Sequence, residues 1–186
     1  MDTKVFIAGS MNIKHLDSKV KMRIDNILAK DFEIVVGDAD GVDASVQTYL
    51  FDNGIKKATV FCSGDRPRNN VGNWPVRSIE TYHPQGSRAF FAAKDIRMAE
   101  VADFGLMIWD AKSPGTLSNV IELLARKKKS IVFVNKEKIF KRISNVEELE
   151  DLVSHMSEHA RRNANEKIKL FDRINSLKQE QMQMFA

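Results

Sequence analysis

Cysteine and long apolar runs are scarce in this sequence, and both absences narrow the class of protein. Cys62 is the one cysteine among 186 residues, so no disulfide can form within the chain. Because Cys62 lies in an apolar stretch, we expect it to be a core residue in a reducing environment. No apolar run approaches the roughly 18 residues that a membrane-spanning helix needs, and the first residues lack the apolar core of a secretory leader. We therefore expect a cytoplasmic protein with no membrane partner.

The motifs of several well-known catalytic sites are also missing. There is no Gly-x-Ser-x-Gly elbow and no Walker-type phosphate loop. The four histidines are scattered, and the one pair with helical spacing, His155 and His159, has no further ligand near it in the sequence. We therefore expect neither a bound metal nor a resident cofactor.

Charge is abundant but nearly balanced. The chain has 29 Lys and Arg against 25 Asp and Glu, a net charge of +4, with a sequence pI of about 9.1. This excess suits an anionic ligand and is weak support for nucleic acid binding. The most basic stretch, Arg126–Lys129, is expected to form the last turn of a helix, where cations complement the negative end of the helix dipole.

Short apolar runs alternate with segments of helical periodicity, which predicts an α/β protein. Continuous apolar strands between helices are typical of a parallel sheet that is covered on both faces. We therefore expect a Rossmann-like three-layer sandwich with a mainly parallel sheet of about five strands. The expected strands are residues 5–8, 34–36, 58–62, 104–109 and 131–134. This domain would span residues 1–136, and residues 137–186 would form a C-terminal helical extension, with a break between its helices at residues 163–165.

The segment from Ser63 to about Ser87 is long, polar and without periodicity. A structureless loop of this length is uncommon in a compact domain and is often functional. Arg66, Arg68 and Arg88 are candidates to bind phosphate, because the guanidinium group binds phosphate through two hydrogen bonds. The residues of the loop that could contact a base are Asn69, Asn70, Trp74 and Tyr82.

Three turns are expected to meet where the strands end. In open α/β sheets, ligands bind at the carboxyl edge, where the strand order reverses. Gly9 and Ser10 follow the first strand and would form the floor of a crevice. The turn after the fourth strand ends in Ser113–Thr116, with Ser113 as helix N-cap, and Gly115 and Thr116 are expected to bind phosphate.

The turn after the second strand contributes glycines and carboxylates to the same crevice. Gly37 and Gly41 would allow close approach of the backbone, and Asp40 is expected to cap the next helix. Asp38 and Asp43 would repel a phosphate, so we expect them to bind the sugar hydroxyls. A helix dipole contributes about 0.3–2 kcal/mol, whereas micromolar affinity requires about 8 kcal/mol, so the arginines must contribute as well.

Two motifs resemble the SLOG superfamily. The first is the Gly-rich turn Gly37–Asp43, and the second runs from Met98-Ala99 through Ala102-Asp103 to Ser113–Thr116. This superfamily includes LOG-type phosphoribohydrolases, whose phosphate-binding segment is similar to the second motif, and DprA-like DNA-processing proteins, whose turn is similar to the first. The resemblance covers roughly residues 4–134. It implies a Rossmann-like domain that binds a nucleotide or a nucleotide derivative, often as a homodimer.

The sequence departs from the LOG pattern at two positions. Lys94 stands where LOG enzymes have a catalytic arginine, and Asn119 stands where they have a glutamate. Since an amide cannot act as an acid or base, a sensor or binding domain for a nucleotide-derived small molecule is the main prediction, with Lys94 steadying the phosphate.

Two alternatives remain. One is a nucleotide N-glycosidase, phosphoribohydrolase or transferase with Asp43, Asp95 or Glu122 as the acidic group. The other is DprA-like binding of single-stranded DNA, with an affinity that falls steeply with salt.

Overall fold

A seven-stranded sheet forms the centre of the computed structural model, which describes residues 1–186. The strand order is β4-β3-β2-β1-β5-β6-β7, and every neighbouring pair is parallel except β6 and β7. The strands are β1 (Lys4–Gly9), β2 (Glu33–Val36), β3 (Ala58–Ser63), β4 (Val76–Ile79), β5 (Phe104–Trp109), β6 (Ser130–Val134) and β7 (Ile139–Ile143). The predicted three-layer α/β class is thus confirmed.

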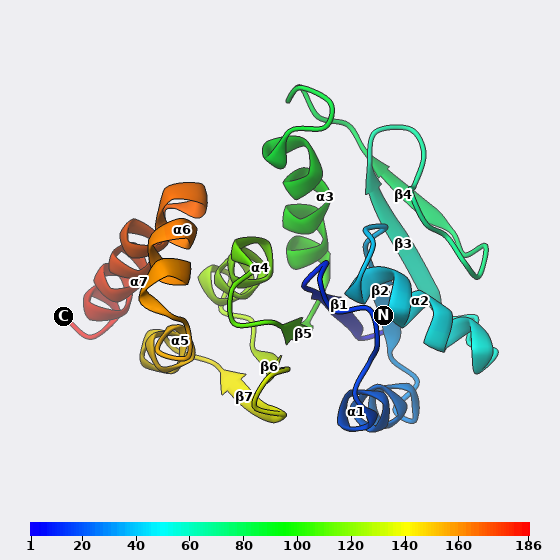
Figure 1. The fold of residues 1–186 in the computed structure, drawn as a ribbon, viewed down its shortest axis with the longest axis horizontal. Coiled ribbons are helices and arrows are strands. Elements are labelled where there is room, and N and C mark those ends of the chain that lie inside the picture. The colour runs from blue at the N-terminus through cyan, green and yellow to red at the C-terminus, as the bar shows by residue number, and fades with distance from the viewer.

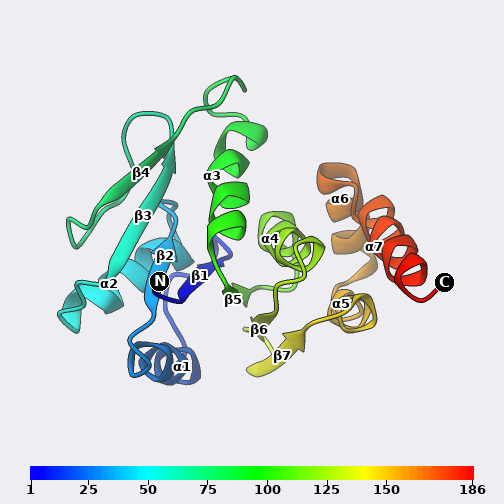
Figure 2. The same cartoon turned by 180° about the vertical axis from the view of Figure 1, so that it is seen from behind.

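Seven helices cover the sheet. They are α1 (Ser18–Leu28), α2 (Val42–Asp52), α3 (Arg88–Val101), α4 (Pro114–Ala125), α5 (Val146–Val153), α6 (Glu158–Ile168) and α7 (Leu170–Met184). Helices α1 and α2 lie on one side of the sheet and α3 and α4 on the other (Figure 1). Helices α6 and α7 lie beyond α4, away from the sheet, as the reverse view also shows (Figure 2).

Strand residues alternate between two hydrophobic cores, one on each face of the sheet. In β6, for example, Val132 and Val134 belong to the core beneath α3–α7, whereas Phe133 belongs to the core beneath α1 and α2. Cys62 is fully buried, as expected from its apolar surroundings. No helix combines the length and the apolar composition that crossing a membrane requires.

Two strands were not expected from the sequence. The long segment 63–87 is not entirely irregular, because β4 lies within it and pairs with β3. Most of β4 is exposed, so it lacks the apolar run that marks a buried strand. At the other edge, β7 mixes apolar and basic residues because it is only partly buried. Ile143 belongs to one core and Phe140 packs against the other. The expected boundary after residue 136 falls in the β6–β7 turn, so the sheet continues across it.

Several expected helix ends were wrong. The N-cap of α2 is Gly41 rather than Asp40, and no side chain caps that helix. The chain does not break at residues 163–165, which lie inside α6; the break is at Lys169, whose φ of 54° is left-handed. The basic run Arg126–Lys129 begins after α4 has ended, so it does not form the last turn of that helix.

The turn before α2 depends on Gly41. Its φ is 77°, and a Cβ there would lie 2.4 Å from the carbonyl oxygen of Met11. Gly54 also has a positive φ, of 68°, but a Cβ there would meet nothing within 4 Å. Substituting alanine at each glycine therefore separates the free-energy cost of an unfavourable φ, at Gly54, from the additional cost of a backbone clash, at Gly41.

We predict that Gly54→Ala lowers the free energy of unfolding by about 1 kcal/mol, which is the cost of the left-handed conformation. We expect Gly41→Ala to lower it by about 3 kcal/mol or more, because the loop at Met11 must also move. Urea denaturation of both variants measures the difference. Equal losses would show that the loop after β1 is not packed against α2 as described.

Candidate functional site

Ser10 joins the loops at the point where the strand order reverses. Its N–H donates to the carbonyl oxygen of Ile108 (3.0 Å), and its own carbonyl oxygen accepts from the N–H of Val42 (3.3 Å). Its hydroxyl accepts from the N–H of Asp110 (3.1 Å) and lies 3.5 Å from the Thr116 hydroxyl. The ends of β1 and β5 and the starts of α2 and α4 therefore meet at one buried residue.

The turn after β5 is shaped by Asp110. Its carboxylate accepts from the N–H groups of Lys112 (2.8 Å) and Ser113 (2.7 Å) and from the Ser113 hydroxyl (2.8 Å). Burial raises the pKa of Asp110, but these hydrogen bonds outweigh burial and lower it below its ordinary value. Ser113 is the N-cap of α4, as predicted, although its hydroxyl donates to Asp110 instead of capping the helix.

The first N–H groups of α4 have no partner. Neither Gly115 nor Thr116 donates a backbone hydrogen bond within the protein. A Cβ at Gly115 would meet no atom within 4 Å, so the space beside this residue is open. The partial positive charge of a helix N-terminus thus faces a free volume, which is the arrangement that binds phosphate and carboxylate.

A cavity of about 450 Å³ adjoins this helix start. It contains most of the residues predicted from the sequence: Gly9, Ser10, Asp43, Arg68, Arg88, Lys94, Ser113, Gly115 and Thr116. It also contains residues that were not predicted, among them Met11, Asn12 and Phe91. Asn119, which replaces the LOG glutamate, lines it as well.

Four predicted residues lie outside the lining of this cavity. Gly37 lies behind it, where a Cβ would stand 2.4 Å from a carboxylate oxygen of Asp43. Asp38 is buried beside it, and Arg66 is exposed on the loop. Gly41 lines a separate cavity on the outer side of α2.

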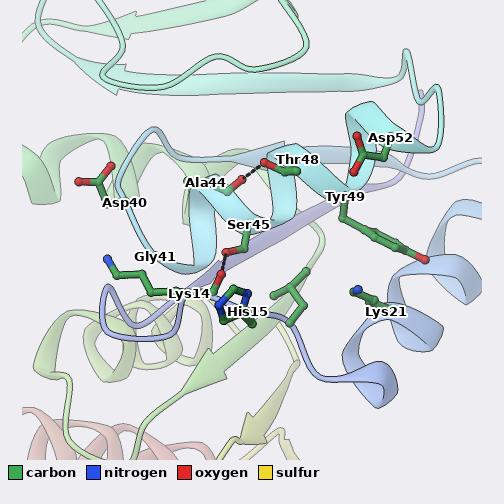
Figure 3. Close-up of a pocket in the computed structure, with 11 residues that line it drawn as sticks. Lys14, His15, Lys21, Asp40, Gly41, Ala44, Ser45, Thr48, Tyr49 and Asp52 are labelled. Atoms are coloured by element: carbon green, nitrogen blue, oxygen red, sulfur yellow. Dashed lines mark hydrogen bonds between the residues drawn. The ribbon is translucent and has the colours of Figure 1, made fainter.

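That separate cavity also measures about 450 Å³ and lies between α2 and the loop after β1 (Figure 3). The Ser45 hydroxyl donates to the carbonyl oxygen of Lys14 (2.7 Å), and the Thr48 hydroxyl donates to that of Ala44 (3.0 Å). Asp40 lines this cavity and not the one at the start of α4, so it faces away from the candidate phosphate site.

Asp38 holds Arg68 in place instead of facing a sugar. The Arg68 guanidinium donates to both carboxylate oxygens (2.9 and 3.2 Å), and the Arg68 N–H donates to one of them (2.8 Å). Burial raises the pKa of Asp38, but the bonds from Arg68 outweigh burial and lower it. The guanidinium also lies over the ring of Phe91, 4.3 Å from its centre. Arg68 is therefore pre-organised at the rim of the cavity.

Asp43 and Lys94 form a buried charged centre beneath the cavity. The Lys94 ammonium donates to Asp95 (2.7 Å), and the carboxylates of Asp95 and Asp43 raise the pKa of Lys94 despite its burial. Burial raises the pKa of Asp43 to about 7, although the charge of Lys94 opposes this. One Asp43 oxygen accepts from the N–H of Ala39 (3.2 Å), whereas the other is buried and has no partner.

Gln47 supports the site and was missed by the sequence analysis. Its amide donates to the carbonyl oxygens of Gly37 (2.9 Å) and Asn69 (3.1 Å), and its carbonyl accepts from the N–H of Val71 (2.9 Å). This fully buried side chain ties the long loop to the end of β2. Its one signal in the sequence was a polar residue beside the apolar stripe of α2.

Trp74 and Glu122 do not take part in the site. The Trp74 indole donates to the carbonyl oxygen of Ile55 (2.9 Å) and is buried in the core, so it anchors the loop and stacks on no ligand. Glu122 accepts from Arg173 of α7 (2.8 Å) and does not line the cavity, so it is not positioned as an acid there. No group of three or more metal-ligating side chains is present.

Comparisons with known proteins identify the fold. No protein-family model matches the sequence, and no curated protein matches it. DNA processing protein A (DprA) from Streptococcus pneumoniae superposes with a TM-score of 0.54 at 18% identity, over 70% of this chain and 50% of that one. A structure that describes the single-stranded DNA binding mode of DprA from Helicobacter pylori superposes with a TM-score of 0.54 at 21% identity, over 90% of this chain and 80% of that one.

At these identities the similarity shows the fold alone. The chain spans about half the length of the Streptococcus pneumoniae protein. The fold of this protein is therefore similar to the Rossmann-like fold of DprA.

We predict that Asp43→Asn becomes more stable relative to the wild type as the pH rises from about 4 to about 7. In this range, wild-type Asp43 binds a proton in the folded protein (pKa about 7) but not in the unfolded chain, so the free energy of unfolding of the wild type falls as the pH rises. The free energy of unfolding of Asp43→Asn does not fall in this way. Relative to the wild type it therefore rises with pH, by at most about 4 kcal/mol.

Urea denaturation at pH 5 and pH 8 tests this prediction. Asp52→Asn, which removes an exposed carboxylate of α2, is the control. A stability difference between Asp43→Asn and wild type that is the same at both pH values would contradict the assignment.

Proposed function

We propose that the cavity at the start of α4 binds the phosphate of a nucleotide unit, and that single-stranded DNA presents it. The observation that carries this proposal is the pair of unpaired N–H groups at Gly115 and Thr116, which share one cavity with Lys94, Arg68 and Arg88. A helix N-terminus together with guanidinium groups is a typical phosphate site.

The choice of single-stranded DNA rests on the fold and on the loop. The fold is similar to that of DprA, and one DprA structure describes binding of single-stranded DNA. Tyr82 is fully exposed in the segment between β4 and α3, where it is available to stack on a base. Arg88, six residues further along the chain, begins α3 and lines the cavity. Aromatic side chains beside cations are typical of surfaces that bind single strands. We also propose, on the same grounds, that residues 1–136 form a SLOG-type domain.

We predict that Gly115→Asp weakens binding to a fluorescently labelled oligo(dT) at least tenfold, because a carboxylate at the helix start repels phosphate. The open space at Gly115 predicts little change in thermal stability. The matched control is Asn175→Asp, which adds the same charge to the exposed face of α7. Fluorescence anisotropy at several salt concentrations measures both the affinity and its salt dependence.

The salt dependence tests the class of ligand, and the Gly115→Asp variant tests the position of the phosphate site. The proposal is supported if the wild-type affinity for the oligonucleotide falls steeply with salt and Gly115→Asp binds it much more weakly. An affinity that does not change with salt would rule out single-stranded DNA. Equal affinities of Gly115→Asp and wild type would rule out the cavity as the phosphate site.

A free ribonucleotide is the second candidate, and the unpaired oxygen of Asp43 favours it. A buried acceptor without a partner is costly, and a ribose hydroxyl would satisfy it. DNA lacks the 2′-hydroxyl, so this interaction would distinguish a ribonucleotide from a deoxyribonucleotide.

If this candidate is correct, wild-type protein at pH 8, where Asp43 is ionised, binds AMP more tightly than dAMP, and Asp43→Ala, which removes both carboxylate oxygens, reduces the difference. Removing one hydrogen bond to a charged group corresponds to about 1.5–3 kcal/mol, or roughly 10- to 150-fold in affinity. Isothermal titration calorimetry with both nucleotides measures the ratio. Equal binding of AMP and dAMP by the wild type would exclude a role of Asp43 in sugar recognition.

A further inference from the structure

A further cavity, of about 350 Å³, lies at the opposite edge of the sheet from the candidate site. It is bounded by the second half of α1 and by the starts of β1, β5 and β6. Its apolar lining is Val5, Ile27, Phe32, Phe104, Leu106 and Ile131. The volume is within the range of small-ligand sites, roughly 300–1,000 Å³.

Phe104 gives this cavity an accessible aromatic surface. It is the first residue of β5 and is 45% exposed, although β5 is otherwise buried. The neighbouring residue, Gly105, lines the cavity with its backbone alone, because a Cβ there would point to the opposite face of the sheet, 2.3 Å from Leu123. A planar group can therefore approach Phe104.

All the charged residues that line the cavity are cations. Arg23 extends from α1, Lys30 lies in the turn after that helix, Lys129 precedes β6, and Arg142 lies on β7. The first three form no ion pair, and Arg142 has only a long contact, 3.9 Å, with Glu148. Four like charges around one small cavity repel one another, and an anion between them would relieve this repulsion.

The nearby carboxylates do not neutralise these cations. No carboxylate lines the cavity, and neither Glu33 nor Asp103 forms an ion pair with one of its cations. Glu33 is instead paired with the ammonium of Lys4 (3.4 Å). Two of the cations lie over aromatic rings instead. The Arg23 guanidinium is 4.7 Å from the centre of the Phe140 ring, and the Lys30 ammonium is 5.9 Å from that of Phe32. These contacts place the cations without cancelling their charge.

The basic run Arg126–Lys129 contributes one residue to this cavity. Arg126 pairs with Glu100 and Glu122, and Lys128 donates to the carbonyl oxygens of Ala99 (2.9 Å) and Glu100 (2.6 Å). Lys129 has no such partner and lines the cavity. In this run, Arg126 and Lys128 thus hold α3 and α4 together, whereas Lys127 forms no ion pair. Lys129 borders both this cavity and another one beside α5 and α7.

We propose that this cavity is a second ligand site, for a small aromatic polyanion of the nucleoside triphosphate class. The four cations bind the phosphates, and the base stacks on Phe104. This site is independent of the proposed function, because it shares no residue with the cavity at the start of α4.

The test uses the 186-residue protein carrying Gly115→Asp, so that the cavity at the start of α4 does not contribute to binding. Isothermal titration calorimetry is carried out with ATP, inorganic triphosphate and adenosine, without magnesium. We expect ATP to bind more tightly than inorganic triphosphate and adenosine to bind weakly. The double substitution Lys30→Glu and Arg142→Glu is expected to weaken ATP binding at least tenfold.

Lys56→Glu with Lys167→Glu is the matched control. Both residues are exposed and form no ion pair, and the pair of substitutions changes the net charge by the same amount. ATP binding that is lost only in the cavity variant supports the proposal. An equal loss in both double variants, no ATP binding in the Gly115→Asp background, or triphosphate bound as tightly as ATP would overturn it. A protein that fails to bind DNA but binds ATP here would separate the two proposals.

Discussion

The hydrogen bonds of Ser10 are the constraint on which the candidate site depends. One small buried residue uses its N–H, its carbonyl and its hydroxyl to join β1 to β5, to α2 and to the turn before α4. The buried N–H, carbonyl and hydroxyl of Ser10 all have partners, in β5, α2 and the turn after β5. The position of the free N–H groups of α4 is therefore fixed by the centre of the sheet.

The charged side chains around the cavity form ion pairs, and these pairs differ in which donor and acceptor atoms remain free to bind a ligand. Asp38 uses both its oxygens on Arg68, which fixes the guanidinium but does not bury it completely. Lys94 is paired with Asp95, and Asp43 keeps one oxygen unbound. Removing one partner of a buried ion pair destabilises the fold by more than the pair contributes to stability. The main effect of such a pair is therefore to fix the positions of its two side chains. We therefore expect the proposed phosphate binding to depend on the positions of these donors and acceptors more than on the overall charge of the protein, which is modest.

The sequence was sufficient for the sheet centre, for the class of fold and for nine of the nineteen residues that line the cavity. Those predictions used features that local periodicity and turn chemistry encode directly, such as the apolar run of β5 and the Ser113–Thr116 helix start. The edge strands β4 and β7 were missed because strands exposed on one side or on both carry no continuous apolar run. The pairing of Asp38 with Arg68 and the role of Gln47 were missed because they connect α2 and β2 to a loop some 20 to 30 positions away. Periodicity contains no information about such contacts.

The pairing of β1 with β5 is expected to slow the folding of the chain. Val5 lies opposite Phe104, so the two central strands are separated by almost a hundred residues. A parallel contact over that distance requires closure of a very long loop, which slows folding. During synthesis, one edge of β1 therefore stays unpaired until β5 has emerged, and the apolar residues of β1–β3 remain open to other strands in that interval.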